Sequence, residues 1–145
     1  MPQEIKLTLT VNSVIDNLDD AGLPDGDPEI NIFTTVGDLT VSDKGMKLSF
    51  TEDCEGQKTV TTLFVINDKV TLGKRGAIES DITFHEGEIY KTVYKVGPYA
   101  FDMTVDTKRI RCNMTRLGGE LQLIYSMNVG GQDKNVRMKI TAKAN

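Results

Sequence analysis

The sequence predicts an all-β fold, a single antiparallel up-and-down β-barrel of about ten strands that spans residues 1–145 as one domain. Composition favours sheet, because the 145 residues include 16 Thr, 12 Val and 11 Ile but only 5 Ala, and β-branched residues fit strands better than helices. Patterning agrees, because apolar and polar residues alternate along almost the whole chain. We therefore expect less than about a tenth of the residues in helix.

Segments with one apolar face recur from the start of the chain to its end. In the first, Ile5, Leu7 and Leu9 alternate with Lys6 and Thr8. A period of two residues is typical of a strand that is buried on one face only. The same alternation is found in segments 46–51, 78–84, 99–106, 120–129 and 136–141.

The breaks between these segments are short and rich in turn-forming residues, which predicts hairpins. Six such breaks occur at 42–45, 55–56, 67–68, 86–87, 118–119 and 130–131. Tight turns make neighbours in sequence neighbours in the sheet. Ten strands with one apolar face are best buried by closing the sheet into a barrel, which also removes its exposed edges.

Segment 16–29 contains six carboxylates and two prolines and is expected to be a long loop after the first strand. Its Asp25-Gly26-Asp27 run resembles part of a calcium-binding loop. The spacing of an EF-hand loop is absent, and no flanking helix is predicted. A solvated acidic loop is the favoured interpretation, and calcium binding stays open as the alternative.

Charge excludes several classes of function. The chain has a net charge of −4, which does not fit a general nucleic-acid-binding protein. One His and two Cys cannot build a multi-histidine zinc site or a thiolate cage. No metal or other cofactor is therefore expected. The lone His85 is expected to be a surface residue at a turn rather than a general base, since no nucleophile motif accompanies it.

The charge is unevenly distributed, with +6 on residues 108–145 and −10 on the rest. Arg109 and Arg111 share one strand face, and Arg137 shares another with Lys139 and Lys143. If these strands flank segment 120–129, the outer face of the barrel carries a basic stripe. A solvated exterior is the favoured interpretation, because nucleic-acid binding would need exposed aromatic residues between the charges.

The sequence shows no sign of export or membrane insertion. No basic stretch followed by an apolar run is found at the N-terminus, and the longest apolar run, 63–66, has four residues. A cytoplasmic protein without membrane contact is therefore expected. Cys54 and Cys112 are interpreted as unrelated free thiols, with Cys54 exposed in a polar turn and Cys112 less accessible within a strand.

Two charged residues continue the apolar faces of their strands. Glu52 follows the face of Met46, Leu48 and Phe50, and Lys74 follows that of segment 70–72. Buried charges are costly unless they are paired or used. An ion pair between them, a site for a polar ligand, and a position at the barrel rim with both charges in water are the three alternatives.

Several short motifs resemble, in order and approximate spacing, those of the YwiB-like family. They are Leu-Ser-Phe-Thr-Glu at 48–52, Lys-Arg-Gly-Ala at 74–77, Phe84 with Gly87, Tyr94 before Pro98-Tyr99, 107–110 and 119–125. YwiB-like proteins are small, uncharacterised bacterial proteins with a calycin-like, lipocalin-type barrel. The resemblance covers nearly the whole chain and implies that fold but no activity.

The resemblance implies seven positions of interest, namely Glu52, Lys74, Gly76, Tyr94, Tyr99, Thr107 and Tyr125. This chain has Phe50 where the family usually has Tyr, Ala100 where Gly is common, and Lys74 where the family usually has Arg. The last change puts bidentate anion recognition at position 74 in doubt, because only Arg offers a planar pair of donors.

The leading hypothesis for function is a barrel that binds one small, partly apolar molecule inside. Glu52, Lys74, Tyr94, Tyr99 and Tyr125 are the candidate binding residues, beside an apolar wall that includes Phe50, Phe101 and Met127. The main alternative is a filled, non-catalytic barrel that acts through a protein partner. An enzyme using Glu52 with Lys74 or a tyrosine for proton transfer is a third possibility. Ligand identity and oligomeric state do not follow from the sequence.

Overall fold

The computed structural model describes residues 3–54 and 56–144, and for Gln3 and Cys54 only the backbone is described. The described residues form ten strands and no helix, as the alternation predicts. The strands are β1 (Gln3–Asn17), β2 (Glu29–Ser42), β3 (Gly45–Cys54), β4 (Gln57–Ile66), β5 (Lys69–Gly76), β6 (Ile78–His85), β7 (Ile89–Val96), β8 (Tyr99–Cys112), β9 (Gly118–Val129) and β10 (Gln132–Ala144).

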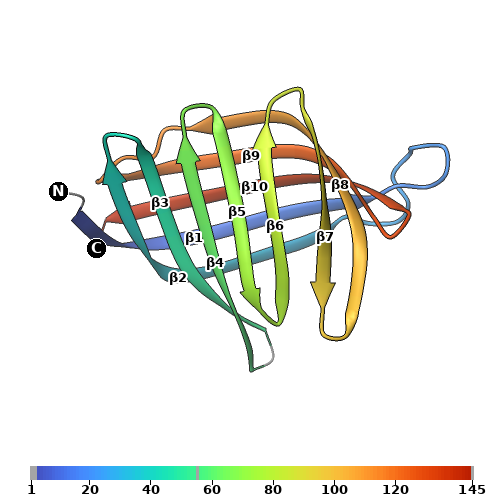
Figure 1. The fold of residues 1–145 in the computed structure, drawn as a ribbon, viewed down its shortest axis with the longest axis horizontal. Helices are drawn as coiled ribbons and strands as arrows, with labels where there is room; N and C mark the ends of the chain where they lie inside the picture. Colours follow the sequence, from blue (N-terminus) through green and yellow to red (C-terminus); the bar gives the residue numbers. More distant parts are fainter. Residues whose placement is uncertain (1–2, 55, 145) are drawn as a thin grey trace.

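The ten strands close into an antiparallel up-and-down barrel (Figure 1). Each strand pairs with its neighbours in sequence, and β1 closes the ring by pairing with β10 as well as with β2. The turns β2–β3, β4–β5 and β6–β7 lie at one end, which we call the upper end. The turns β3–β4, β5–β6 and β7–β8 lie at the opposite, lower end (Figure 1). The expected barrel topology is confirmed.

The barrel has two walls, because pairing is short at two seams. Strands β2 and β3 pair only between 38–42 and 45–49, and β6 pairs with β7 only through Ile78 and Glu79. Strands β3 to β6 form the front wall, and β8 to β10 with β1 and β2 form the rear wall, at a steep angle to the front strands (Figure 1). Facing sheets that cross in this way enclose a core between their inner faces.

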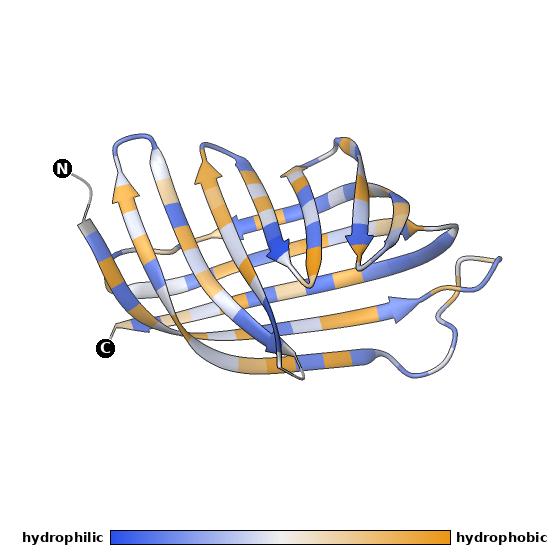
Figure 2. Cartoon of the chain, turned by 60° about the horizontal axis from the view of Figure 1, so that its bottom comes forward, coloured by the Kyte–Doolittle hydropathy of each residue, from blue (hydrophilic) through white to orange (hydrophobic). Residues whose placement is uncertain are grey.

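The core follows from strand parity, since successive side chains point to opposite faces of a sheet. Figure 2 shows this as alternating hydrophilic and hydrophobic positions along the strands. The inward apolar residues include a group with at most 1% exposure, namely Leu7, Leu9, Leu39, Leu63, Val70, Phe84, Val105, Leu121, Leu123 and Ile140. The upper and middle parts of the front wall contribute Leu63, Val70 and Phe84 to it.

Two boundaries differ from the sequence prediction. Gly118 and Gly119 begin β9, and the chain turns before them at 113–117. Gly118 has a φ of 115°, and a Cβ there would meet the carbonyl oxygen of Ala142. The lack of a side chain at Gly118 therefore allows β9 to lie close to β10, in addition to the role of these glycines near a turn. The predicted acidic loop is also shorter, because β1 continues to Asn17 and the loop comprises 18–28.

Candidate functional site

The inner face of the front wall changes from apolar to polar towards the lower end. The middle row, joined by strand register, is Leu48, Leu63, Leu72 and Ile82. The next row down is Phe50, Thr61, Lys74 and Ser80, and the last is Glu52, Thr59 and Gly76. Thr59, Thr61 and Ser80 are all buried. Polar groups that face a barrel interior need partners, so the lower rows are the candidate site.

Glu52 and Lys74 form an ion pair on this inner face. The Lys74 Nζ lies 3.5 Å from Oε1 of Glu52, and the same oxygen accepts a hydrogen bond of 3.3 Å from the Thr61 hydroxyl. The side chains are 25% exposed for Glu52 and 19% for Lys74. Of the three alternatives that the sequence left open, the structure shows the ion pair. Both side chains are partly buried and keep some contact with solvent.

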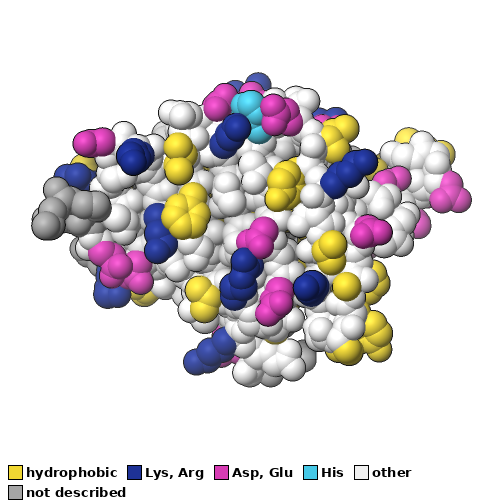
Figure 3. All heavy atoms as spheres, viewed as in Figure 1, with side chains coloured by type: hydrophobic (Ala, Val, Ile, Leu, Met, Phe, Trp, Pro, Cys, Tyr) yellow, Lys and Arg dark blue, Asp and Glu magenta, His cyan; other side chains and the backbone are white. Residues whose placement is uncertain are grey.

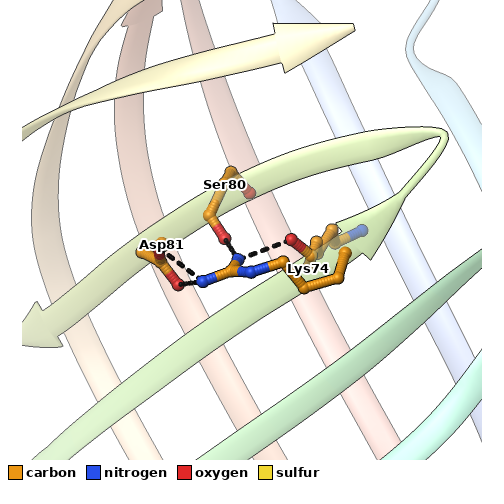
Figure 4. A network of polar contacts seen from close by, with 4 residues as sticks. Lys74, Ser80 and Asp81 are labelled. Atoms are coloured by element: carbon orange, nitrogen blue, oxygen red, sulfur yellow. Dashed lines mark hydrogen bonds and ion pairs between the residues drawn. The ribbon is translucent and has the colours of Figure 1, made fainter. Parts of the chain in front are cut away.

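Arg75 lies next to Lys74 but points to the outside of the barrel. Its guanidinium donates to both carboxylate oxygens of Asp81 at 2.9 Å and to the backbone carbonyls of Lys74 and Ser80 (Figure 4). Strand parity therefore gives the two neighbouring cations different environments. The guanidinium is used on the outer surface, whereas the described inner face of β5 has the ammonium group of Lys74.

Two tyrosines pack in or against the barrel core, and one of them, Tyr94, is influenced by the ion pair. Tyr94, from β7, is half-buried, and burial together with the negative charge of Glu52 raises the pKa of its hydroxyl. Tyr125, from β9, is 6% exposed, and burial followed by the effect of Tyr94 raises its pKa as well. Both hydroxyls stay protonated near neutral pH and are available as donors.

Aromatic rings frame the polar groups. The ring of Tyr125 packs against that of Phe84 with centroids 4.7 Å apart, and Phe50 packs against Phe33 of β2 at 6.1 Å. Offset or tilted ring pairs at such distances are favourable contacts. The site thus combines an ion pair and two hydroxyls with an apolar surround.

Sequence reasoning missed two polar groups, Thr61 and Thr107. Thr61 holds the Glu52 carboxylate, and its inward parity with Leu63 was the available signal. Thr107 matched the family pattern but was not singled out as a site residue. It pairs with Tyr125, is 1% exposed, and its hydroxyl has no hydrogen-bond partner among the described residues. An unpaired buried hydroxyl is costly, but the Thr107 backbone is hydrogen-bonded to Gly87 and Glu88 of the β6–β7 turn, so this hydroxyl lies towards the upper end and not beside the ion pair.

Tyr99 does not join this cluster. It is 66% exposed, and Phe101 on the same strand face is 41% exposed. Both side chains were expected to line the barrel interior. That expectation is wrong, because both are exposed to solvent. The reason is that the β7–β8 hairpin ends at the lower end, where Tyr99 has little structure in front of it. Tyr99 lines an open hollow of about 420 Å³ there, with Glu79 and Lys95.

Comparison with known proteins places the chain in a family. A model described as a domain of unknown function, DUF1934, matches residues 23–141. The chain belongs to the DUF1934 family. It is 28% identical over 142 residues to the uncharacterized beta-barrel protein YwiB of Bacillus subtilis (strain 168), covering 97% of this chain and 95% of that protein.

A solved structure supports the fold of this DUF1934 chain. The crystal structure of the ywiB protein from Bacillus subtilis matches with a TM-score of 0.85 and 27% identity, over 99% of this chain and 95% of that chain. The resemblance to YwiB-like proteins is thereby confirmed. No helix within the described residues is long and apolar enough to cross a membrane.

Three further residues singled out in the sequence are His85, Cys112 and Cys54. His85 is half-buried at the upper end, with Nε2 3.0 Å from Asp68 and Nδ1 2.9 Å from Glu88. Cys112 is exposed, so its expected protection within a strand is wrong, because it is the last residue of β8. The side chain of Cys54 lies outside the described residues.

The acidic loop is ordered by its own backbone. Oδ1 of Asp19 accepts hydrogen bonds from the backbone N–H groups of Ala21 and Leu23. Leu18 donates its N–H to the carbonyl of Asp133, which ties the loop to the β9–β10 turn. Among the described residues, no three His, Cys, Asp or Glu side chains are grouped so as to hold a metal ion.

Proposed function

We propose that this protein binds one small, partly apolar molecule in the lower half of its barrel. The observation that supports the proposal is the partly buried ion pair of Glu52 and Lys74, whose carboxylate contributes to the raised pKa of the half-buried Tyr94. Polar groups gathered at one end of an apolar interior orient a ligand, while the apolar wall provides affinity. Barrels of about this strand number can hold one small ligand, as in lipocalin-type barrels.

The site chemistry indicates what the molecule carries. The carboxylate of Glu52 accepts hydrogen bonds, and the ammonium of Lys74 and the tyrosine hydroxyls donate them. A ligand with a neighbouring donor and acceptor at one end, and an apolar body beside Phe33 and Phe50, satisfies both parts.

Native mass spectrometry of freshly purified protein tests the proposal. We expect a second species heavier than the chain by the mass of one small molecule, which disappears after denaturation and refolding. The extracted compound, added back to refolded protein, should bind less tightly by about tenfold or more to Glu52→Gln and Lys74→Met, because each change removes a charged hydrogen-bond partner.

An ion pair on the barrel exterior provides the matched control. Lys6 and Asp38 lie 2.8 Å apart on β1 and β2 and face solvent. Lys6→Met and Asp38→Asn remove the same chemical groups away from the interior and should leave affinity unchanged. An equal loss of affinity in the interior and exterior variants would contradict binding at this site. Purified protein that carries no additional mass would contradict it as well.

The second candidate function is a filled barrel that acts through a protein partner. It is favoured by the close packing of the core, where Leu63, Val70 and Phe84 have no exposed surface. The same mass spectrum separates the two candidates, since a filled barrel carries no bound molecule.

A further inference from the structure

Three hollows adjoin one another on the outer face of the rear wall, along β9. Their volumes are about 430, 230 and 340 Å³. Gln122 lines the first and second, and Ile124 and Arg137 line the second and third. The hollows are therefore one groove that follows the outward side chains of β9.

Cationic side chains line this groove from both neighbouring strands. Strand register accounts for their arrangement, because Gln122 pairs with Arg111 of β8 on one side and with Lys139 of β10 on the other. We define the basic groove as the floor of Gln122 and Ile124 with the lining cations Lys108, Arg111, Arg137 and Lys139. It is the middle of the basic stripe that the sequence predicts.

The two arginines of the basic groove are unpaired. Each lysine already has a carboxylate partner, Asp106 at 2.7 Å and Glu120 at 3.4 Å, and Asp16 also lines the groove. Neither arginine forms an ion pair with any described residue, and neither does the adjacent Arg109. Guanidinium groups bind carboxylates through two parallel hydrogen bonds, so the groove has capacity for further carboxylates.

The lining favours a peptide over a nucleic acid. Single-stranded nucleic acids bind through bases stacked on exposed aromatic rings, and the one aromatic residue bordering the groove, Tyr125, has its side chain inside the barrel. The outer face instead has aliphatic residues, with Val14 in the groove and Ile30 and Ile32 each 60% exposed beside it. A peptide in which carboxylates are interspersed with apolar side chains fits this surface.

The chain itself contains such a segment in the acidic loop, residues 18–28. Asp20, Asp25 and Asp27 form no ion pair with described residues, and Leu23 is 61% exposed. The loop projects beyond the barrel, with acidic and hydrophobic side chains on its surface (Figures 1 and 3). Residues 19–28 are all exposed, so the loop is accessible to another molecule.

We propose that the acidic loop of one copy docks in the basic groove of a second copy of this chain. Charge complementarity supports the occupant, because free aspartates on the loop face free arginines in the groove. Because the loop and the groove are different surfaces, the docking links copies either reciprocally, as a two-fold dimer, or in series, through a head-to-tail contact. The proposal is independent of any ligand inside the barrel.

Sedimentation velocity of the full chain at low and high salt tests the docking. We expect association at about 0.01 M salt and monomer at about 1 M, because screening shortens the reach of charges from about 30 Å to about 3 Å. Charge reversal in the groove, Arg111→Glu with Arg137→Glu, should abolish association. Charge reversal in the loop, Asp20→Lys with Asp25→Lys, should abolish it as well.

Mixing the two variants gives the sharpest result. The groove variant keeps a normal loop and the loop variant keeps a normal groove, so the mixture should associate although neither component does. Lys91→Glu with Lys95→Glu, on the exposed face of β7, changes the net charge by the same amount as the groove variant and should leave association intact. A misfolded variant could not restore association in the mixture.

Other occupants are outcomes that overturn the proposal. A chain that stays monomeric at low salt, or a mixture that does not associate, excludes docking between copies. If the monomer instead binds an oligoglutamate peptide, and Arg111→Glu with Arg137→Glu prevents it, the groove serves a different acidic protein. Binding of oligothymidylate with the same dependence would assign it to nucleic acid.

Discussion

The ammonium of Lys74 lies 3.5 Å from the carboxylate of Glu52 inside the barrel, whereas the neighbouring Arg75 binds Asp81 on the outside. Two adjacent cations on one strand therefore serve opposite faces. The inner pair is partly buried, and the contact lies at the long end of hydrogen-bond distances. Such a pair contributes to stability less than a tight buried pair and leaves capacity for a further partner.

Removing one member of the inner pair should destabilise the fold by about 1–2 kcal/mol, because the other charge is left half-buried without a partner. Glu52→Ala and Lys74→Met should each show this loss in urea melts. The double variant should recover part of it, so that the coupling in the double-mutant cycle is about 0.5–1 kcal/mol. Strictly additive losses would mean that the two groups do not interact.

Phe84 should be one of the most sensitive positions in the core. Its side chain is fully buried and packs on Tyr125 at 4.7 Å between ring centroids. Phe84→Ala should lower the free energy of unfolding by about 3–5 kcal/mol, through lost burial and the cavity left behind. Phe64, 41% exposed on the outer face of β4, is the control. Phe64→Ala should cost under about 1 kcal/mol, and similar losses would contradict the assigned parity.

Gly76 should not tolerate a side chain. Its φ of 131° is unfavourable for other residues, and a Cβ there would meet the carbonyl oxygen of Lys58 on β4. We expect Gly76→Ala to destabilise the barrel by about 2 kcal/mol or more, measured by denaturant melts. Gly56, with a φ of 82° and open space around it, is the control for backbone strain alone. If both alanine variants lose the same stability, the contact with Lys58 is unimportant.

His85 should titrate above its ordinary value. The hydrogen bond with Asp68, followed by the contact with Glu88, raises the pKa of the imidazole, and the His85 contact lowers the pKa of Asp68. The stability from charged His85 is therefore fully present below about pH 6.5 and is lost as pH rises through the raised pKa. The stability from ionised Asp68 is fully present above about pH 3.9 and is lost as pH falls through the lowered pKa of its carboxyl group.

NMR titration of the imidazole measures this directly, because His85 is the one histidine of the chain. Asp68→Asn should move its pKa back towards about 6.5, since the main cause of the rise is removed. A His85 pKa at or below 6.5 in the parent protein would show that these contacts do not form in solution.

Several features were predictable from the sequence because they depend on strand parity alone. Alternation along the chain determined the strands, the inward position of Glu52 and Lys74, and the burial of Tyr125. It also placed Arg111 and Lys139 on one outer face, since β8 and β10 both pair with β9. A period of two needs no knowledge of distant contacts.

Other features were decided by the tertiary structure. Glu52, on β3, contributes after burial to the raised pKa of Tyr94, on β7, although three strands separate them in the sheet, because the sheet curves into a barrel. Such separations are not encoded in local pattern. Tyr99 has inward parity yet is exposed, because burial requires a facing surface and the lower end provides none there. The acidic and basic segments were visible in the sequence. The closure of the sheet decides that the acidic segment projects as a loop and that the basic segment lines a groove.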